Sequence, residues 1–243
     1  MNPSIKRIAL VADLHGNLPA VQALEKDLER RDIREIYCLG DVVGKGPSSA
    51  ETFDWAFSHC QVLLQGNWDS GIGYMQFPND RFYYGQLGPE RMKKLRDMPQ
   101  EYSFTLSGRK IRLLHGRPVM QELLSPTSAS EKLEWLFDPD YQVVGYADIH
   151  RQALRMIGTR GILFNTGAVG NGLGVPMVQY TILTGSETDA DAPFDISFVT
   201  FSYDREAAVA DAEKVQKDLP KWDLYCKEIR TARYSRMNTG KND

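Results

Sequence analysis

Polar residues follow a series of short apolar runs in this chain, and this arrangement constrains the fold more than any other feature. Residues 8–11 are apolar and are followed by Asp13 and His15, while later apolar runs lead to Asp41 and Asn67. Short apolar runs between turn residues are typical of buried strands. The first strands start roughly 30 residues apart, as in βαβ units with parallel strands and right-handed crossovers. We therefore expect polar side chains at the carboxyl edge of an α/β sheet, where such folds bind ligands.

The order of helices and strands can be predicted along the chain. Asn17 is a good helix N-cap, and apolar residues recur at helical spacing after it. Expected strands cover residues 5–11, 35–39, 61–64, 102–106, 110–114, 142–145, 153–157, 162–165, 177–183 and 196–201. Expected helices start at residue 18, cover 48–58, 89–98, 130–137 and 205–217, and end with one that reaches about residue 233. Residues 70–87 are rich in Gly, Tyr and Phe, and we expect them to cover the surface.

Composition limits the class of protein. The 243 residues are 42% hydrophobic and 25% charged, as in an ordinary globular protein. Because no linker divides the chain, we expect one domain over residues 1–235 and a flexible tail over 236–243. The net charge of −3 carries no strong nucleic-acid signature. The first apolar run is too short for export or a membrane span, and the three cysteines lack a CxxC spacing, so we expect a cytoplasmic protein with reduced thiols.

Seven polar residues stand at the ends of five expected strands: Asp13, His15, Asp41, Asn67, His115, Asp148 and His150. A single Asp after a strand is more often a helix cap, and a single His is more often a hydrogen-bonded core residue. Together, Asp, Asn and His are ligands for a divalent ion such as Mn²⁺, Fe²⁺, Ni²⁺ or Zn²⁺. Seven ligands are too many for one ion but suit two ions that share a carboxylate. Taken alone, Asp13 and His15 would equally suit an acid–base pair without metal.

The motifs that contain these residues resemble a known family. They are Asp13-x-His15, Gly40-Asp41, Gly66-Asn67-x-Asp69, His115-Gly116, Asp148-x-His150 and the loop Asn165-Thr166-Gly167-Ala168-Val169-Gly170. In this order and spacing they resemble the calcineurin-like metallophosphoesterases, over about residues 5–185. The resemblance is greatest to the small prokaryotic branch that includes YfcE-like phosphodiesterases and diadenosine-tetraphosphate hydrolases.

The resemblance implies a fold and a metal centre. The implied fold is an α/β four-layer αββα sandwich of two mixed β-sheets flanked by helices, with the metal site at the carboxyl ends of the strands. One divalent ion would be bound by Asp13, His15 and His150. The other would be bound by Asn67, His115 and Asp148, with Asp41 between the two ions. Mn²⁺ is the expected ion, and Fe, Ni, Zn and Mg are the other candidates.

The resemblance also implies a reaction. Two ions about 3.5–4 Å apart would activate a hydroxide between them, which attacks phosphorus in line. The implied catalytic residues are Asp41, Asn67, Asp69 and His115. The implied substrate-binding residues are Asn67, Lys45 and Arg117. For Lys45 and Arg117, a solvated loop position is the competing interpretation.

Two positions depart from the family pattern. Trp68 stands where the family generally has a His that protonates the leaving group, and an indole cannot transfer a proton at neutral pH. Asp148 stands where the family has a His. If Asp148 binds the second ion, its carboxylate would favour Mn²⁺ or Mg²⁺. If Asp148 does not bind metal, the second ion would be loosely held. The aromatic residues between Tyr74 and Tyr84 would either stack on a base or cover the edge of a sheet.

The leading expectation is a metal-dependent phosphoesterase that acts on phosphodiester or phosphomonoester bonds of a small phosphorylated substrate. Nucleotides and dinucleoside polyphosphates are plausible substrates. The alternative is a catalytically impaired module that binds metal or nucleotide and acts by interaction, which Trp68 and Asp148 favour. An acid–base hydrolase without metal is a third interpretation.

Overall fold

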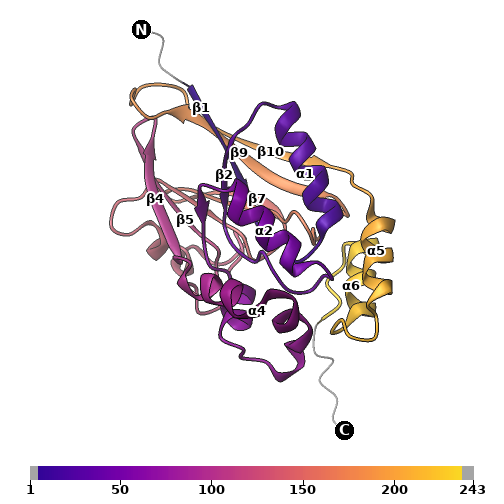
Figure 1. Ribbon diagram of the computed structural model, residues 1–243. Helices are drawn as coiled ribbons and strands as arrows, with labels where there is room; N and C mark the ends of the chain where they lie inside the picture. The colour runs from indigo at the N-terminus through magenta and orange to yellow at the C-terminus, as the bar shows by residue number, and fades with distance from the viewer. Residues whose placement is uncertain (1–4, 237–243) are drawn as a thin grey trace.

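The computed structural model describes residues 5–236, which form two five-stranded sheets and six α-helices (Figure 1). The strands are β1 (Ile5–Val11), β2 (Glu35–Cys38), β3 (Val62–Leu63), β4 (Glu101–Leu106), β5 (Arg109–Leu114), β6 (Val143–Tyr146), β7 (Gln152–Ile157), β8 (Gly161–Thr166), β9 (Val178–Ser186) and β10 (Asp195–Phe201). The helices are α1 (Leu18–Arg30), α2 (Ser49–His59), α3 (Asn67–Gly73), α4 (Arg81–Asp97), α5 (Arg205–Lys214) and α6 (Trp222–Thr231).

The first sheet has the strand order β10-β9-β1-β2-β3 and is mixed. Strand β1 is parallel to β2 and β2 is parallel to β3, whereas β9 runs antiparallel to both β1 and β10. Val11 pairs with Cys38, so the carboxyl ends of β1 and β2 lie side by side. The backbone N–H of Asp13 donates to the carbonyl of Gly40 at 2.9 Å, which continues the pairing into the loops.

The second sheet has the order β4-β5-β6-β8-β7 and is also mixed. Its three central strands are parallel, and Leu113 pairs with Gly145. The backbone N–H of Ala147 donates to the carbonyl of His115 at 2.8 Å. The loops after β5 and β6 therefore leave this sheet together.

Side chains alternate between two layers of core, as expected for strands with two buried faces. Ile8 and Leu10 of β1 pack against Leu113 and Phe164 of the second sheet. Ala9 and Val11 face the other way, toward helices α1, α2, α4, α5 and α6. The outer face of the second sheet is covered by 3₁₀ turns and loops of residues 119–141. This arrangement confirms the expected αββα architecture of two mixed sheets.

The predicted order of strands is confirmed, but α3 and the part of α4 before Gly88 were not predicted. Residues 74–82 are mostly exposed, as expected for a surface cover, whereas Ile72, Tyr83 and Leu87 on either side of them join the core around the helices. The backbone of Gly88 has φ +65°, which breaks α4 into two helical pieces and divides the apolar pattern. Residues 130–137 form two 3₁₀ turns instead of one helix.

Within residues 5–236, no helix combines the length and apolar character that a bilayer crossing requires. The expected tail over 236–243 lies outside the described residues except for Arg236. The one-domain interpretation stays a prediction.

Candidate metal centre

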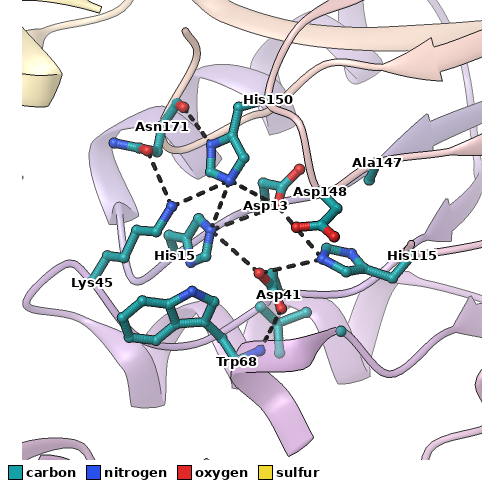
Figure 2. Close-up of polar contacts among 12 residues, drawn as sticks. Asp13, His15, Asp41, Lys45, Trp68, His115, Ala147, Asp148, His150 and Asn171 are labelled. Atoms are coloured by element: carbon teal, nitrogen blue, oxygen red, sulfur yellow. Dashed lines mark hydrogen bonds and ion pairs between the residues drawn. The ribbon is translucent and has the colours of Figure 1, made fainter. Parts of the chain in front are cut away.

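Loops at one edge of the two sheets bring the predicted ligands together (Figure 2). Asp13 and His15 follow β1, and Asp41 follows β2; the backbone N–H of His15 donates to the carbonyl of Asp41 at 3.1 Å. Asn67 begins α3, His115 follows β5, and Asp148 and His150 follow β6.

Several of these loop residues have an unusual backbone conformation. The φ angles are +55° at Asp13, +46° at His15, +55° at Asp41, +68° at Asp148 and +58° at His150. Left-handed φ values cost a non-glycine residue about 1–2 kcal/mol and cluster at functional sites. The backbone is therefore strained at these five residues, whose side chains lie in or beside the cluster.

The side chains form two overlapping groups, Asp13–His15–His150 and Asp13–Asp41–His115, with ligand atoms within 4.8 Å of one another in each group. Asp13 Oδ1 lies 3.3 Å from His150 Nε2, 3.6 Å from His15 Nε2 and 4.0 Å from His115 Nε2. Asp41 Oδ2 lies 3.5 Å from His15 Nε2 and 3.3 Å from His115 Nε2. Two carboxylates therefore lie between the imidazoles of the two groups.

Backbone carbonyls orient all three imidazole rings. Nδ1 of His15 lies 3.3 Å from the carbonyl oxygen of Val43. Nδ1 of His115 lies 2.7 Å from that of Leu39, and Nδ1 of His150 lies 2.6 Å from that of Asn171. A carbonyl only accepts, so each Nδ1–H donates and each Nε2 is turned toward the cluster. Burial lowers the pKa of His15 and of His150 well below the ordinary value, and the nearby charge of Lys45 adds to this. Both rings are therefore neutral, as a metal ligand must be.

The buried polar atoms fit a pair of divalent cations. Both oxygens of Asp13, Oδ1 of Asn67 and Nε2 of His115 are buried without a hydrogen-bond partner among the described residues. Burial raises the pKa of the Asp13 carboxyl well above its ordinary value, with His115 opposing and Asp41 adding to the rise. An unpaired buried carboxylate is costly unless a cation compensates it. The residues present therefore fit two metal ions.

Asp69 is fully buried and contacts backbone amides of the loops that contain the cluster. Its two oxygens accept from the N–H groups of Asp41 at 2.7 Å, Val42 at 3.0 Å and Gly66 at 2.9 Å. Burial, followed by the charge of Asp41, raises the pKa of Asp69 to about 7. The carboxyl group ties the loop after β2 to the loop before α3, which contain Asp41 and Asn67.

Asp148 lies beside the cluster but belongs to neither group of ligand atoms. Its oxygens accept from Arg117 Nε at 2.8 Å and Nη2 at 2.6 Å, and from the Arg117 backbone N–H at 3.1 Å. Burial alone would raise the pKa of Asp148, but these hydrogen bonds lower it below the ordinary value. Asp148 is thus an ionised carboxylate paired with a guanidinium that is 40% exposed.

Lys45 is buried, and its Nζ lies 3.2 Å from His150 Nε2 and 3.3 Å from Asn171 Oδ1. Sequence reasoning missed Asn171, which also contacts Glu228 Oε2 through Nδ2 at 3.3 Å. It missed Glu228 and Arg236 as well, which form an ion pair at 3.4 Å. The available signal was the position of Glu228, three residues after Tyr225 and beside Ile229 on the apolar face of the last predicted helix.

The Trp68 side chain closes one side of the cluster (Figure 2). Its ring meets the His15 ring edge to face, with centroids 5.7 Å apart. Its backbone N–H donates to Asp41 Oδ1 at 2.8 Å. Lys45 Nζ and Arg236 Cζ each lie 5.8 Å from the centre of the Trp68 ring, within the range of cation–π attraction.

Comparisons with known proteins agree with this geometry. Residues 7–188 match the family model described as the calcineurin-like phosphoesterase superfamily domain. The uncharacterized protein MJ0912 of Methanocaldococcus jannaschii is 27% identical, over 88% of this chain and 94% of its own.

Two solved structures share the fold. A metallophosphoesterase from Sphaerobacter thermophilus has a TM-score of 0.72 at 20% identity, covering 94% of this chain and 99% of its own. The hypothetical protein PH1004 from Pyrococcus horikoshii OT3 has a TM-score of 0.75 at 21% identity, with the same coverage. Together with the family match and the two His/Asp groups, they lead to one conclusion: the chain belongs to the calcineurin-like phosphoesterase superfamily.

Proposed function

We propose that this protein is a divalent-metal-dependent phosphoesterase that hydrolyses phosphodiester or phosphomonoester bonds of small substrates, nucleotides or dinucleoside polyphosphates among them. The observation that carries the proposal is the pair of buried His/Asp groups that share Asp13 and present unpaired ligand atoms. Mn²⁺ is the expected ion, because four of the seven proposed ligands supply carboxylate or amide oxygens beside three imidazoles.

The proposed ligands are Asp13, His15 and His150 for one ion, and Asn67, His115 and Asp148 for the other, with Asp41 between them. When bound, two such ions act as Lewis acids toward water and neutralise charge on phosphoryl oxygens. Asp148 would share its charge between Arg117 and the second ion, because Arg117 donates three hydrogen bonds to a carboxylate that has about four acceptor sites. Asp69 acts by fixing the loops that contain Asp41 and Asn67.

Cations beside the cluster suit phosphate binding. Lys45 is held over the first group, and the guanidinium of Arg117 lies next to the second. Both are proposed to bind phosphoryl oxygens, Lys45 as a point charge and Arg117 through paired donors. Asn67 is the third substrate-binding residue, since its amide offers a donor beside its unpaired oxygen.

Trp68 restricts the leaving groups that the site can expel. Its indole lies against His15 but cannot donate a proton to a departing alkoxide at neutral pH. We therefore propose a preference for acidic leaving groups, such as a nitrophenolate or a phosphate.

The second candidate function is a binding module without turnover. It is favoured by the pairing of Arg117 with Asp148, which removes one proposed ligand from the second ion. Such a module would bind metal or nucleotide and act through a partner.

Reconstitution separates these functions. The full chain is stripped with EDTA, loaded with Mn²⁺ and assayed with bis(p-nitrophenyl) phosphate and p-nitrophenyl phosphate. Asp41→Asn is the test variant, and Asp97→Asn, an exposed position in α4, is the matched control. We expect Mn²⁺-dependent hydrolysis by the wild type and the control but not by Asp41→Asn.

Three results would contradict the proposal in different ways. Wild-type activity no greater than that of Asp41→Asn excludes phosphoester hydrolysis by this site. Stoichiometric Mn²⁺ binding by calorimetry without turnover identifies the binding module. Less than one metal ion per chain by elemental analysis after reconstitution, with hydrolysis retained, favours an acid–base hydrolase.

A further inference from the structure

A pocket of about 640 Å³ lies beside the metal centre, between α3, the start of α4 and the segments on either side of α6. Residues that line it include Asn67, Trp68, Phe77, Tyr83, Tyr234 and Arg236. We call it the side pocket. Its volume is within the range of small-molecule binding sites.

The side pocket and the metal centre share a wall. Asn67 lines the pocket and is also one of the proposed ligands, with a buried Oδ1 that has no hydrogen-bond partner among the described residues. Trp68 lines the pocket while its ring edge contacts His15. A phosphate bound in the metal centre would therefore have its substituent next to the pocket.

Aromatic side chains supply much of the apolar lining. Phe77 and Tyr234 are 54% and 49% exposed, which is unusual for large rings and leaves their faces available to a ligand. Tyr83 is fully buried, and its hydroxyl has no hydrogen-bond partner within residues 5–236. This combination of ring faces with an unpaired hydroxyl fits a flat aromatic group with polar edges.

Arg236 places a cation between the pocket and the metal centre. Its side chain is 6% exposed, and its Nε and Nη2 make no hydrogen bond to any described residue. It forms an ion pair with Glu228, which also contacts Asn171. A guanidinium buried with free donors fits an anion that arrives with the ligand. Lys217 and Lys221 line the pocket as well.

We propose that the side pocket binds the base of a nucleotide substrate and that Arg236 binds its phosphate. The proposal rests on the proposed phosphoesterase function and adds the substrate class. A sugar phosphate would engage the cations but not the rings, and a purely apolar group would leave Nη2 of Arg236 and the hydroxyl of Tyr83 without a hydrogen bond. A nucleoside phosphate engages both.

Binding to metal-free protein tests the pocket apart from hydrolysis. The affinities of the four ribonucleoside 5′-monophosphates and of ribose 5-phosphate are measured by calorimetry on the EDTA-treated full chain. We expect at least one nucleotide to bind more tightly than ribose 5-phosphate, by roughly 5- to 150-fold for a stacked base.

Variants assign this preference to the pocket. Phe77→Ala and Tyr234→Ala should reduce the preference for the base, while Tyr74→Ala, at an exposed ring outside the pocket, should leave it unchanged. Arg236→Gln should weaken nucleotide and ribose 5-phosphate alike, and Arg233→Gln, an exposed neighbour, should weaken neither.

Equal affinity of all four nucleotides and ribose 5-phosphate would overturn the proposal, as would a base preference that survives both ring variants. Circular dichroism and thermal unfolding check that every variant is folded. If the base preference is found but Mn²⁺-loaded protein hydrolyses nothing, the pocket assignment stands and the phosphoesterase function fails. If nitrophenyl esters are hydrolysed but no base preference is found, the phosphoesterase function stands and the pocket assignment fails.

Discussion

Arg117 holds Asp148 through a fork of two side-chain hydrogen bonds, from Nε at 2.8 Å and from Nη2 at 2.6 Å. The carboxylate is nearly buried, whereas the guanidinium is 40% exposed. The pair neutralises an anion at the edge of the proposed second ion site. It therefore stabilises the metal-free protein while competing with metal for Asp148.

Removing the guanidinium should expose this competition. We expect Arg117→Gln to lower the free energy of unfolding in EDTA by about 1.5–3 kcal/mol, because Asp148 loses a charged partner. Saturating Mn²⁺ should restore part of this loss, because Asp148 is then released to the ion. Urea unfolding with EDTA or Mn²⁺ measures both effects. The matched control is Arg34→Gln at the exposed Arg34–Asp32 pair, which should cost less than about 1 kcal/mol. A loss that Mn²⁺ does not reduce would show that Asp148 is not a ligand.

Asp13→Asn should separate metal binding from folding. Asp13 is shared by both groups of ligand atoms, so the variant should lose most of the stabilisation that Mn²⁺ gives the wild type, which is about 2.7 kcal/mol at 100 times Kd. In EDTA the variant should be at least as stable as the wild type at neutral pH. The reason is that burial raises the pKa of Asp13, so its ionised form costs the folded state stability. Thermal unfolding with and without Mn²⁺ gives the comparison, and a variant stabilised as much as the wild type would contradict the shared role.

Acid should remove the stability that the hydrogen bonds of Asp27, in α1, give the folded protein. Burial alone would raise the pKa of Asp27, but hydrogen bonds from Tyr180, Arg31 and Arg30 lower it below its ordinary value. A lowered folded-state pKa adds stability above the unfolded pKa of about 4, and this stability is lost as pH falls through the folded pKa. Asp27→Asn should therefore cost about 1.5–3 kcal/mol at pH 7 and progressively less below about pH 4. Unfolding titrations at several pH values test this, with the exposed Asp32→Asn as control; a pH-independent difference would refute it.

Gly44 is required next to Trp68. Its φ is +84°, and a Cβ there would lie 2.3 Å from Trp68 Cε3. Gly44→Ala should cost about 2–4 kcal/mol from backbone strain and overpacking, and should displace the shared wall of the metal centre and side pocket. Gly85→Ala is the matched control, since nothing lies within 4 Å of a Cβ there and the change favours helix. Chemical denaturation of both variants gives the comparison, and equal stabilities would contradict the steric argument.

A proton donor should widen the range of leaving groups. We expect Trp68→His to increase the rate on phenyl esters more than on nitrophenyl esters, because only the poorer leaving group needs protonation. The ratio of kcat values for phenyl and p-nitrophenyl phosphodiesters measures this in wild type and variant. Trp68→Leu, which removes the ring without adding a proton donor, is the control. An equal ratio of kcat values in the His and Leu variants would exclude protonation of the leaving group as the cause.

The cluster could be predicted because its members are tied to local patterns. Asp13, His15, Asp41 and His115 each follow a buried strand, and parallel strands bring their carboxyl ends to one edge. The two-sheet architecture followed from the family resemblance and not from periodicity, which indicated only a parallel sheet for the first third of the chain.

The remaining parts of the site depend on contacts that no local pattern encodes. Arg117 pairs with Asp148 across 31 residues, and Arg236 approaches Trp68 from the segment after α6. Lys45 and Asn171 meet although 126 residues separate them. The burial of Tyr83 and Leu87 was hidden for a different reason, because Gly88 divides the helical pattern of α4 into two short ones.

The wide spacing of the cluster along the chain also sets an order for its assembly during synthesis. His15 and His150, whose Nε2 atoms lie 3.3 Å apart, are separated by 135 positions. At roughly 5–20 residues per second, a ribosome needs on the order of 10 s to pass from one to the other. An unfinished chain thus presents Asp13, His15 and Asp41 without the imidazoles from the second sheet. In the proposed assignment the set of metal ligands is complete only after β6 has been synthesised, and the side pocket is completed later still, when Arg236 emerges.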